Sequence, residues 1–279
     1  MVIFKEKTLT VNFEDLKYHH IKEANPNIIK IIHKGVAFQF KIILKNNNDN
    51  LVVFFNGAYD PTKNQPPIFA RSSWYNDYNA NCIFVDDPTV HDNGITVGWG
   101  IGNKELYYLP LMSEIIIKLS KFLKVYPKKT VYYGSSAGGH LSLAASILHR
   151  NSTAVVNNPQ IHVRSISQGG RYYNLINSNF AGLNEYKLQS MFSERFNIIE
   201  QMHNSNYIPN VVYLLNRDSR EDVELQFRIF EEYINGRSQK DKEKVEYILY
   251  SSPDGHNGMY GREKTALLIN NILDNVRYD

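Results

Sequence analysis

Short apolar runs alternate with longer amphipathic segments along most of this chain. Each run is bounded by turn-forming residues, which is typical of strands buried on both faces of a parallel sheet. The pattern predicts strands at residues 36–45, 51–55, 82–85, 130–134, 153–158, 210–216 and 245–252. The spacing of apolar residues between these runs predicts helices at 104–125, 139–150, 223–236 and 263–276. Pro110 is expected near the start of its helix, where proline is tolerated.

Alternation of strands and helices predicts a mainly parallel central sheet flanked by helices, in the α/β class. The alternation breaks at residues 160–209, which contain helical and aromatic pieces without a clear strand. We interpret this segment as a cap or lid inserted over the carboxyl edge of the sheet, where open α/β sheets bind ligands. The whole chain, 1–279, is then one domain that carries this insertion.

Composition and charge exclude several classes of protein. The chain is 43% apolar, enough for one large core, but it lacks the run of about 18–20 apolar residues that a membrane helix needs. The opening residues have no apolar signal-peptide region, so we expect a cytoplasmic protein. The single cysteine, Cys82, lies in a predicted strand and is expected to be an inert buried thiol. A net charge of +3 spread along the chain predicts no nucleic-acid partner, and no metal-binding motif is present.

The segment GSSAG, at 134–138, supplies candidate chemistry. It matches G-x-S-x-G between a predicted strand and a predicted helix, which is the context of a nucleophile elbow. Small residues on both sides allow a tight turn that exposes one serine, Ser136. A catalytically inert glycine-rich turn is the structural alternative.

A serine nucleophile needs a base, and the base needs an acid that orients it. His256 follows the last predicted strand between two glycines and is the expected base. The acid should follow the strand at 210–216, where Asp218, Glu221 and Asp222 are candidates. We favour Asp218, which comes just past the strand end, because Asp222 would lie in the first helical turn with a simple capping role.

Two backbone N–H groups are expected to form an oxyanion hole. The residue after the nucleophile, Ala137, should supply one of them, and Ala58 in the turn after an early strand should supply the other. A plain turn is the alternative for Asn56-Gly57-Ala58.

With these motifs in this order, residues from about 35 to 279 resemble an α/β-hydrolase, although NGAY replaces the H-G-G-G turn of lipases and esterases. The stretches FARSSW (69–74), DDPTV with GWGIGN (86–103) and NNPQ (157–160) are similar to a narrower bacterial group. That group contains capsular polysaccharide O-acetyltransferases and accessory secretion proteins that modify glycans. The resemblance implies Ser136, Asp218 and His256 as catalytic triad, acetyl-CoA as co-substrate without a tightly bound cofactor, and a polysaccharide hydroxyl as acceptor.

Two alternatives remain open: a serine carbohydrate esterase or carboxylesterase with the same triad, and a non-enzymatic scaffold in glycan export. Transferase and esterase differ in whether a sugar or water reaches the acyl-enzyme, so a lid that excludes water would favour transfer. Arg71 and Arg171 are candidate contacts for a phosphate of CoA or a charged polymer, with ordinary surface charge as the alternative.

Overall fold

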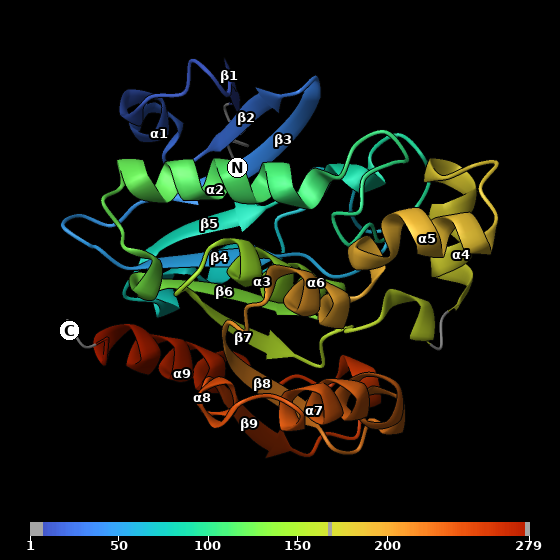
Figure 1. Ribbon diagram of the computed structural model, residues 1–279. Helices are drawn as coiled ribbons and strands as arrows, with labels where there is room; N and C mark the ends of the chain where they lie inside the picture. Colours follow the sequence, from blue (N-terminus) through green and yellow to red (C-terminus); the bar gives the residue numbers. More distant parts are fainter. Residues whose placement is uncertain (1–7, 167–168, 277–279) are drawn as a thin grey trace.

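A nine-stranded sheet runs through the protein (Figure 1), whose computed structural model describes residues 8–166 and 169–276. Its strands are β1 (Thr8–Asn12), β2 (Ile28–His33), β3 (Val36–Ile43), β4 (Leu51–Phe55), β5 (Asn81–Val85), β6 (Thr130–Ser135), β7 (Thr153–Asn157), β8 (Asn210–Asn216) and β9 (Val245–Tyr250). They lie in the order β1-β2-β3-β5-β4-β6-β7-β8-β9. β3 is antiparallel to both of its neighbours, and all the other pairs are parallel.

Helices cover both faces of this sheet. The α-helices are α1 (Tyr18–Ala24), α2 (Tyr108–Phe122), α3 (Ala137–Leu148), α4 (Gly169–Asn179), α5 (Glu185–Phe196), α6 (Ile198–Ser205), α7 (Arg228–Asn235), α8 (Gln239–Lys242) and α9 (Arg262–Asp274). Short 3₁₀ turns occur at η1 (Ser72–Asp77), η2 (Pro88–Val90), η3 (Pro127–Lys129), η4 (Val163–Ser165) and η6 (Gly255–Asn257), and η5 (Asp222–Phe227) is a π-helix.

The central strand β4 shows why the apolar runs fold this way. All five of its residues are buried, because Leu51, Val53 and Phe55 face the core beneath α2 and α3 while Val52 and Phe54 face the core beneath α9. In a strand covered on both faces, apolar residues cannot alternate with polar ones, so the strand appears in the sequence as a continuous apolar run. The predicted α/β class and mainly parallel sheet are confirmed.

Several predicted boundaries needed correction. The sequence analysis did not predict β1 and β2, which extend the sheet beyond β3. The predicted helix at 104–125 is shorter, with Pro110 as its third residue. The predicted helix at 223–236 is two elements, the π-helix η5 followed by α7. Among the described residues, no helix combines the length and apolar character required to cross a bilayer.

The segment 160–209 contains η4 and three helices, α4, α5 and α6. In Figure 1, α4 and α5 lie beyond one end of the sheet. Buried side chains of α4, α5 and the turn between them, including Tyr172, Phe180 and Phe196, form a separate apolar core with the loop after β5. Many aromatic residues of this segment are therefore packing residues. Residues 167 and 168 lie outside the described part of the chain, and the cap or lid role stays a prediction.

Candidate active site

The turn between β6 and α3 has the geometry expected of a nucleophile elbow. Ser136 has φ 56° and ψ −122°, a conformation that is costly for any residue with a side chain. The chain passes so closely here that a Cβ on Gly134 would lie 2.2 Å from the Gly138 carbonyl oxygen. A Cβ on Gly138 would lie 2.7 Å from the Phe55 carbonyl oxygen. Both glycines are thus required for the turn that projects Ser136 from the end of the sheet.

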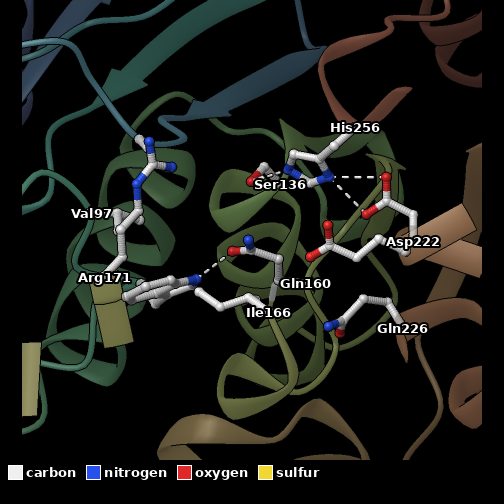
Figure 2. Close-up of a pocket in the computed structure, with 11 residues that line it drawn as sticks. Val97, Ser136, Gln160, Ile166, Arg171, Asp222, Gln226 and His256 are labelled. Carbon is white, nitrogen blue, oxygen red and sulfur yellow. Dashed lines mark hydrogen bonds and ion pairs between the residues drawn. The ribbon is translucent and has the colours of Figure 1, made fainter. Parts of the chain in front are cut away.

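A hydrogen-bonded series of three side chains begins at this serine (Figure 2). His256 Nε2 lies 2.9 Å from Ser136 Oγ, and His256 Nδ1 lies 2.7 and 2.9 Å from the two carboxylate oxygens of Asp222. The Asp222 side chain is only 2% exposed, whereas that of His256 is 25% exposed. A buried carboxylate on one imidazole nitrogen and a serine on the other form the arrangement of a Ser–His–Asp triad.

The prediction that Asp218 is the acid beside His256 is therefore wrong. Asp218 is exposed in the turn after β8, and its backbone N–H bonds the Asn216 side chain. Asp222, which we had treated as a capping residue, is the carboxylate that reaches His256. It opens the π-helix η5, and the Ser219 hydroxyl donates to its Oδ2 at 2.6 Å. Glu221 lines the same pocket but does not occupy this position.

The environment of His256 favours its protonated form. The pKa of His256 is raised above its ordinary value, first by the hydrogen bond to Asp222, with further contributions from the charges of Asp222 and Glu221. Burial and the nearby Arg171 act in the opposite direction. Asp222 thus stabilises the protonated form of His256.

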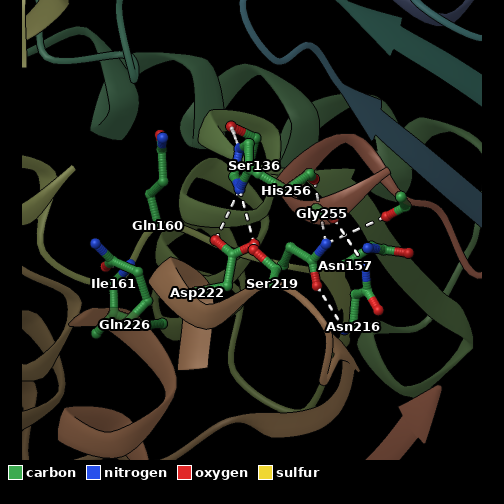
Figure 3. A network of polar contacts seen from close by, with 12 residues as sticks. Ser136, Asn157, Gln160, Ile161, Asn216, Ser219, Asp222, Gln226, Gly255 and His256 are labelled. Carbon is green, nitrogen blue, oxygen red and sulfur yellow. Dashed lines mark hydrogen bonds and ion pairs between the residues drawn. The ribbon is translucent and has the colours of Figure 1, made fainter. Parts of the chain in front are cut away.

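Buried side-chain amides hold the loop that carries His256 (Figure 3). Asn216 Nδ2 donates to the carbonyls of Ser252 and Gly255, each at 2.8 Å. Asn158 Nδ2 donates to the His256 carbonyl at 3.2 Å. Both asparagines follow or end parallel strands, so they tie the His256 loop to the carboxyl edge of the sheet. Sequence reasoning did not predict this role, although asparagine at two successive strand ends was a visible signal.

The proposed oxyanion donors lie close to Ser136. Ala58 lines the pocket around the serine, and a Cβ on the preceding Gly57 would be 3.9 Å from Ser136 Cβ. Ala137 is the first residue of α3, so its N–H has no acceptor one turn earlier within the helix. These placements agree with the expected geometry, and the oxyanion role of Ala58 and Ala137 stays a prediction.

Two cavities meet at Ser136. One is a small chamber lined by residues that include Ala58, Val97, Trp99, Gln160 and Ile166. The other is a cleft of about 760 Å³, open to solvent and lined by residues that include Tyr59, Lys63, Asn257 and Met259. Ala58, Ser136, Arg171 and His256 line both.

The two candidate arginines differ in their surroundings. Arg171 is exposed on α4 and lines both cavities, so it can reach a ligand at Ser136. Arg71 lines neither, and its guanidinium donates to Ser135 Oγ at 2.6 Å and lies over the Trp74 and Tyr133 rings. Arg71 therefore supports the elbow in this structure, and a phosphate contact for either arginine stays a prediction. No cluster of metal-ligating side chains occurs within residues 8–166 and 169–276.

The sheet order, the elbow and the placement of serine, acid and histidine define the fold as that of the α/β-hydrolases. No protein-family model matches the sequence. A search of curated proteins found no match either.

Solved structures share the fold. The capsule O-acetyltransferase of Neisseria meningitidis serogroup A has a TM-score of 0.66 at 16% identity, over 85% of this chain and 95% of that one. A mutant of that enzyme has been solved in complex with CoA. A chain of the glycosylation-associated Gap123 complex from Streptococcus agalactiae has a TM-score of 0.65 at 16% identity, over 89% of this chain and 46% of that one. An S-formylglutathione hydrolase from Agrobacterium tumefaciens has a TM-score of 0.57 at 11% identity, over 89% of this chain and 91% of that one.

Proposed function

We propose that this protein is a serine O-acetyltransferase that moves an acetyl group from acetyl-CoA to a hydroxyl of a bacterial capsular or surface polysaccharide. The observation that carries the proposal is the continuous contact from Asp222 through His256 to Ser136, on a strained elbow at the end of a parallel sheet. A scaffold would not need these three side chains in hydrogen-bonding distance. The likeness to an O-acetyltransferase that binds CoA supports the choice of donor.

The first half of the reaction acylates the serine. Ser136 Oγ attacks the acetyl carbon of the thioester while His256 Nε2, at 2.9 Å, accepts the hydroxyl proton. The Ala58 and Ala137 N–H groups stabilise the oxyanion. The carbon–sulfur bond then breaks, and His256 gives its proton to the leaving sulfur, which departs as the CoA thiol.

The second half of the reaction removes the acetyl group from Ser136. A sugar hydroxyl attacks the acetyl-serine carbonyl carbon while His256 accepts the hydroxyl proton. The bond from the carbonyl carbon to Ser136 Oγ breaks, and the proton returns to that oxygen. Asp222 keeps the imidazole oriented through both halves. In this proposal residues 160–209 act as the cap, and Arg171 at the mouth of the cleft contacts an anionic group of the donor or the polymer.

The open cleft favours a second candidate function. Ser136 and His256 line a space of about 760 Å³ that connects to solvent, so water can reach an acyl-serine. A serine esterase acting on acetylated carbohydrates would use the same three side chains, and the likeness to an S-formylglutathione hydrolase shows that the fold also occurs in a hydrolase.

Release of CoA from acetyl-CoA separates these functions. We would measure it with and without a panel of capsular polysaccharides, for wild type and Ser136→Ala. Transfer predicts release that rises with one polymer and disappears in the variant. Cleavage of simple acetyl esters by wild type, with no acceleration by any polymer, would favour the esterase. If Ser136→Ala keeps both CoA release and ester cleavage, both proposed functions are wrong.

A further inference from the structure

The small chamber beside Ser136 has the position expected for the acyl group of an acyl-serine. It shares Ala58, Ser136, Arg171 and His256 with the open cleft, and Trp99 lines the chamber but not the cleft. Its lining includes the apolar residues Val97, Trp99 and Ile166 and the polar residues Arg171, Glu221 and Gln226. A carbonyl oxygen held near Ala58 would direct its alkyl substituent into one of the two spaces.

The chamber is very small. It offers about 20 Å³ for the centre of a water-sized group. On that scale a single water needs about 10–15 Å³. The methyl of an acetyl group fits this space, and each further methylene would have to displace a wall.

Trp99 is the largest side chain of the wall, and its backbone is tightly held. It is 1% exposed and has a left-handed φ of 50°. A Cβ on Gly98 would lie 2.5 Å from Thr89 Cβ, and one on Gly100 would lie 2.6 Å from Leu141 Cδ2. The buried carboxylate of Asp87 accepts the Gly100 N–H at 2.8 Å. The loop therefore has little freedom to withdraw the indole.

Gln160 joins this wall to the nucleophile (Figure 2). Its side-chain oxygen accepts the Trp99 indole N–H at 2.6 Å, and its backbone N–H donates to the Ser136 carbonyl at 3.2 Å. Its carbonyl accepts a hydrogen bond from Nδ1–H of buried His140 at 2.9 Å. Burial lowers the pKa of His140 to about 4, so that ring is neutral near pH 7. The position of the indole relative to Ser136 is thus set by one short series of hydrogen bonds.

We propose that Trp99 is a specificity-determining residue that restricts the acyl group on Ser136 to two carbons, with Gln160 as the residue that positions it. This inference rests on the proposed acylation of Ser136. A fixed indole rejects longer chains because the small chamber has no room for them and its Trp99 wall is tightly held, whereas the cleft would impose no such limit.

Alkylphosphonofluoridates test the inference without a natural acceptor. Ser136 Oγ forms a bond to phosphorus, fluoride leaves, and the serine proton passes to His256, while the alkyl group occupies the acyl position. We would compare labelling rates for methyl, butyl and hexyl reagents by mass spectrometry. Wild type should prefer methyl over hexyl by about 100-fold or more, since one methylene in a tight pocket is worth about 10–200-fold. Trp99→Ala should lower that ratio about tenfold or more.

Further variants keep the test decisive if Trp99→Ala does not fold. Ile166→Ala opens the same chamber at another wall and should also lower the ratio. Gln160→Met keeps the side-chain length but removes the acceptor, and should lower the ratio by less than Trp99→Ala. Tyr126→Ala is the control, because this exposed aromatic side chain lies outside the chamber, and it should leave the ratio unchanged.

The outcomes separate the inference from the proposed function. Equal labelling of wild type by all three reagents, or an unchanged ratio in both Trp99→Ala and Ile166→Ala, would overturn the inference and leave a reactive serine. No labelling of folded wild type by any reagent would overturn the proposed function, and the inference with it.

Discussion

Replacing Asp222 by asparagine removes the charge that faces His256 while keeping the volume of the side chain. The Ser219 hydroxyl donates to one carboxylate oxygen of Asp222, so the asparagine oxygen is favoured at that position. The amide NH₂ would then face His256 Nδ1, which lies 2.7 Å from the other oxygen. This forces Nδ1 to accept a hydrogen bond and places the ring proton on Nε2, opposite Ser136. Such a histidine cannot accept the serine proton.

The expected loss is large. The corresponding change in a serine protease triad lowers kcat by about 10⁴-fold through the same tautomer effect. Because the Asp222 side chain is only 2% exposed, water cannot stabilise the imidazolium in place of the lost carboxylate. We therefore expect kcat/KM to fall about 10³- to 10⁴-fold, which corresponds to about 4–5.5 kcal/mol of transition-state stabilisation at about 1.36 kcal/mol per tenfold.

Hydrolysis of p-nitrophenyl acetate and release of CoA from acetyl-CoA would both report this loss. Asp218→Asn is the matched control, since Asp218 is exposed and makes no side-chain contact with His256 among the described residues, and it should stay within about twofold of wild type. Circular dichroism would confirm that both variants are folded. Retention of activity by Asp222→Asn together with loss in Asp218→Asn would refute this reasoning.

Three further results are expected. Because the pKa of His256 is raised and the base must be neutral, kcat/KM should fall as the pH drops through a value above 6.5, and Asp222→Asn should move any residual limb to lower pH. Ser136→Gly should raise the free energy of unfolding by about 1–3 kcal/mol, because glycine tolerates φ 56°, ψ −122°; a lower midpoint in urea would contradict the strain argument. Gly134→Ala should lower the free energy of unfolding by about 1–3 kcal/mol or more, because the new Cβ would meet the Gly138 carbonyl. An unchanged thermal midpoint would contradict this packing argument.

Local patterns were enough to predict most of the sheet. Strands such as β4 and β5 are buried on both faces, and that burial appears directly as apolar runs. The strand β1 was missed because only one of its five residues is buried, so its sequence resembles that of a surface segment. Ser136 and His256 could be placed because each depends on a local turn with glycines beside it.

The acid of the triad depends on geometry that apolar spacing does not reveal. Asp218 lies in the turn directly after β8, yet it is Asp222, at the start of the following helix, that contacts His256. The contact between Trp99 and Gln160 joins residues 61 positions apart, and neither neighbourhood contains a signal for the other. The segments that contain Trp99 and Gln160 resemble a bacterial family, but that resemblance implies no role for these two side chains.

The meeting of two cavities at Ser136 has a consequence for kinetic order. The chamber has room for one small group, and the cleft is the only large space at Ser136 among the cavities described above. A donor and an acceptor that both enter through that cleft must occupy it in turn. Initial-rate plots at several fixed acceptor concentrations should then give parallel double-reciprocal lines, as in a ping-pong mechanism, and excess of either substrate should inhibit by occupying the wrong form of the protein. Intersecting lines would indicate that both substrates bind together, by a route that these two cavities do not provide.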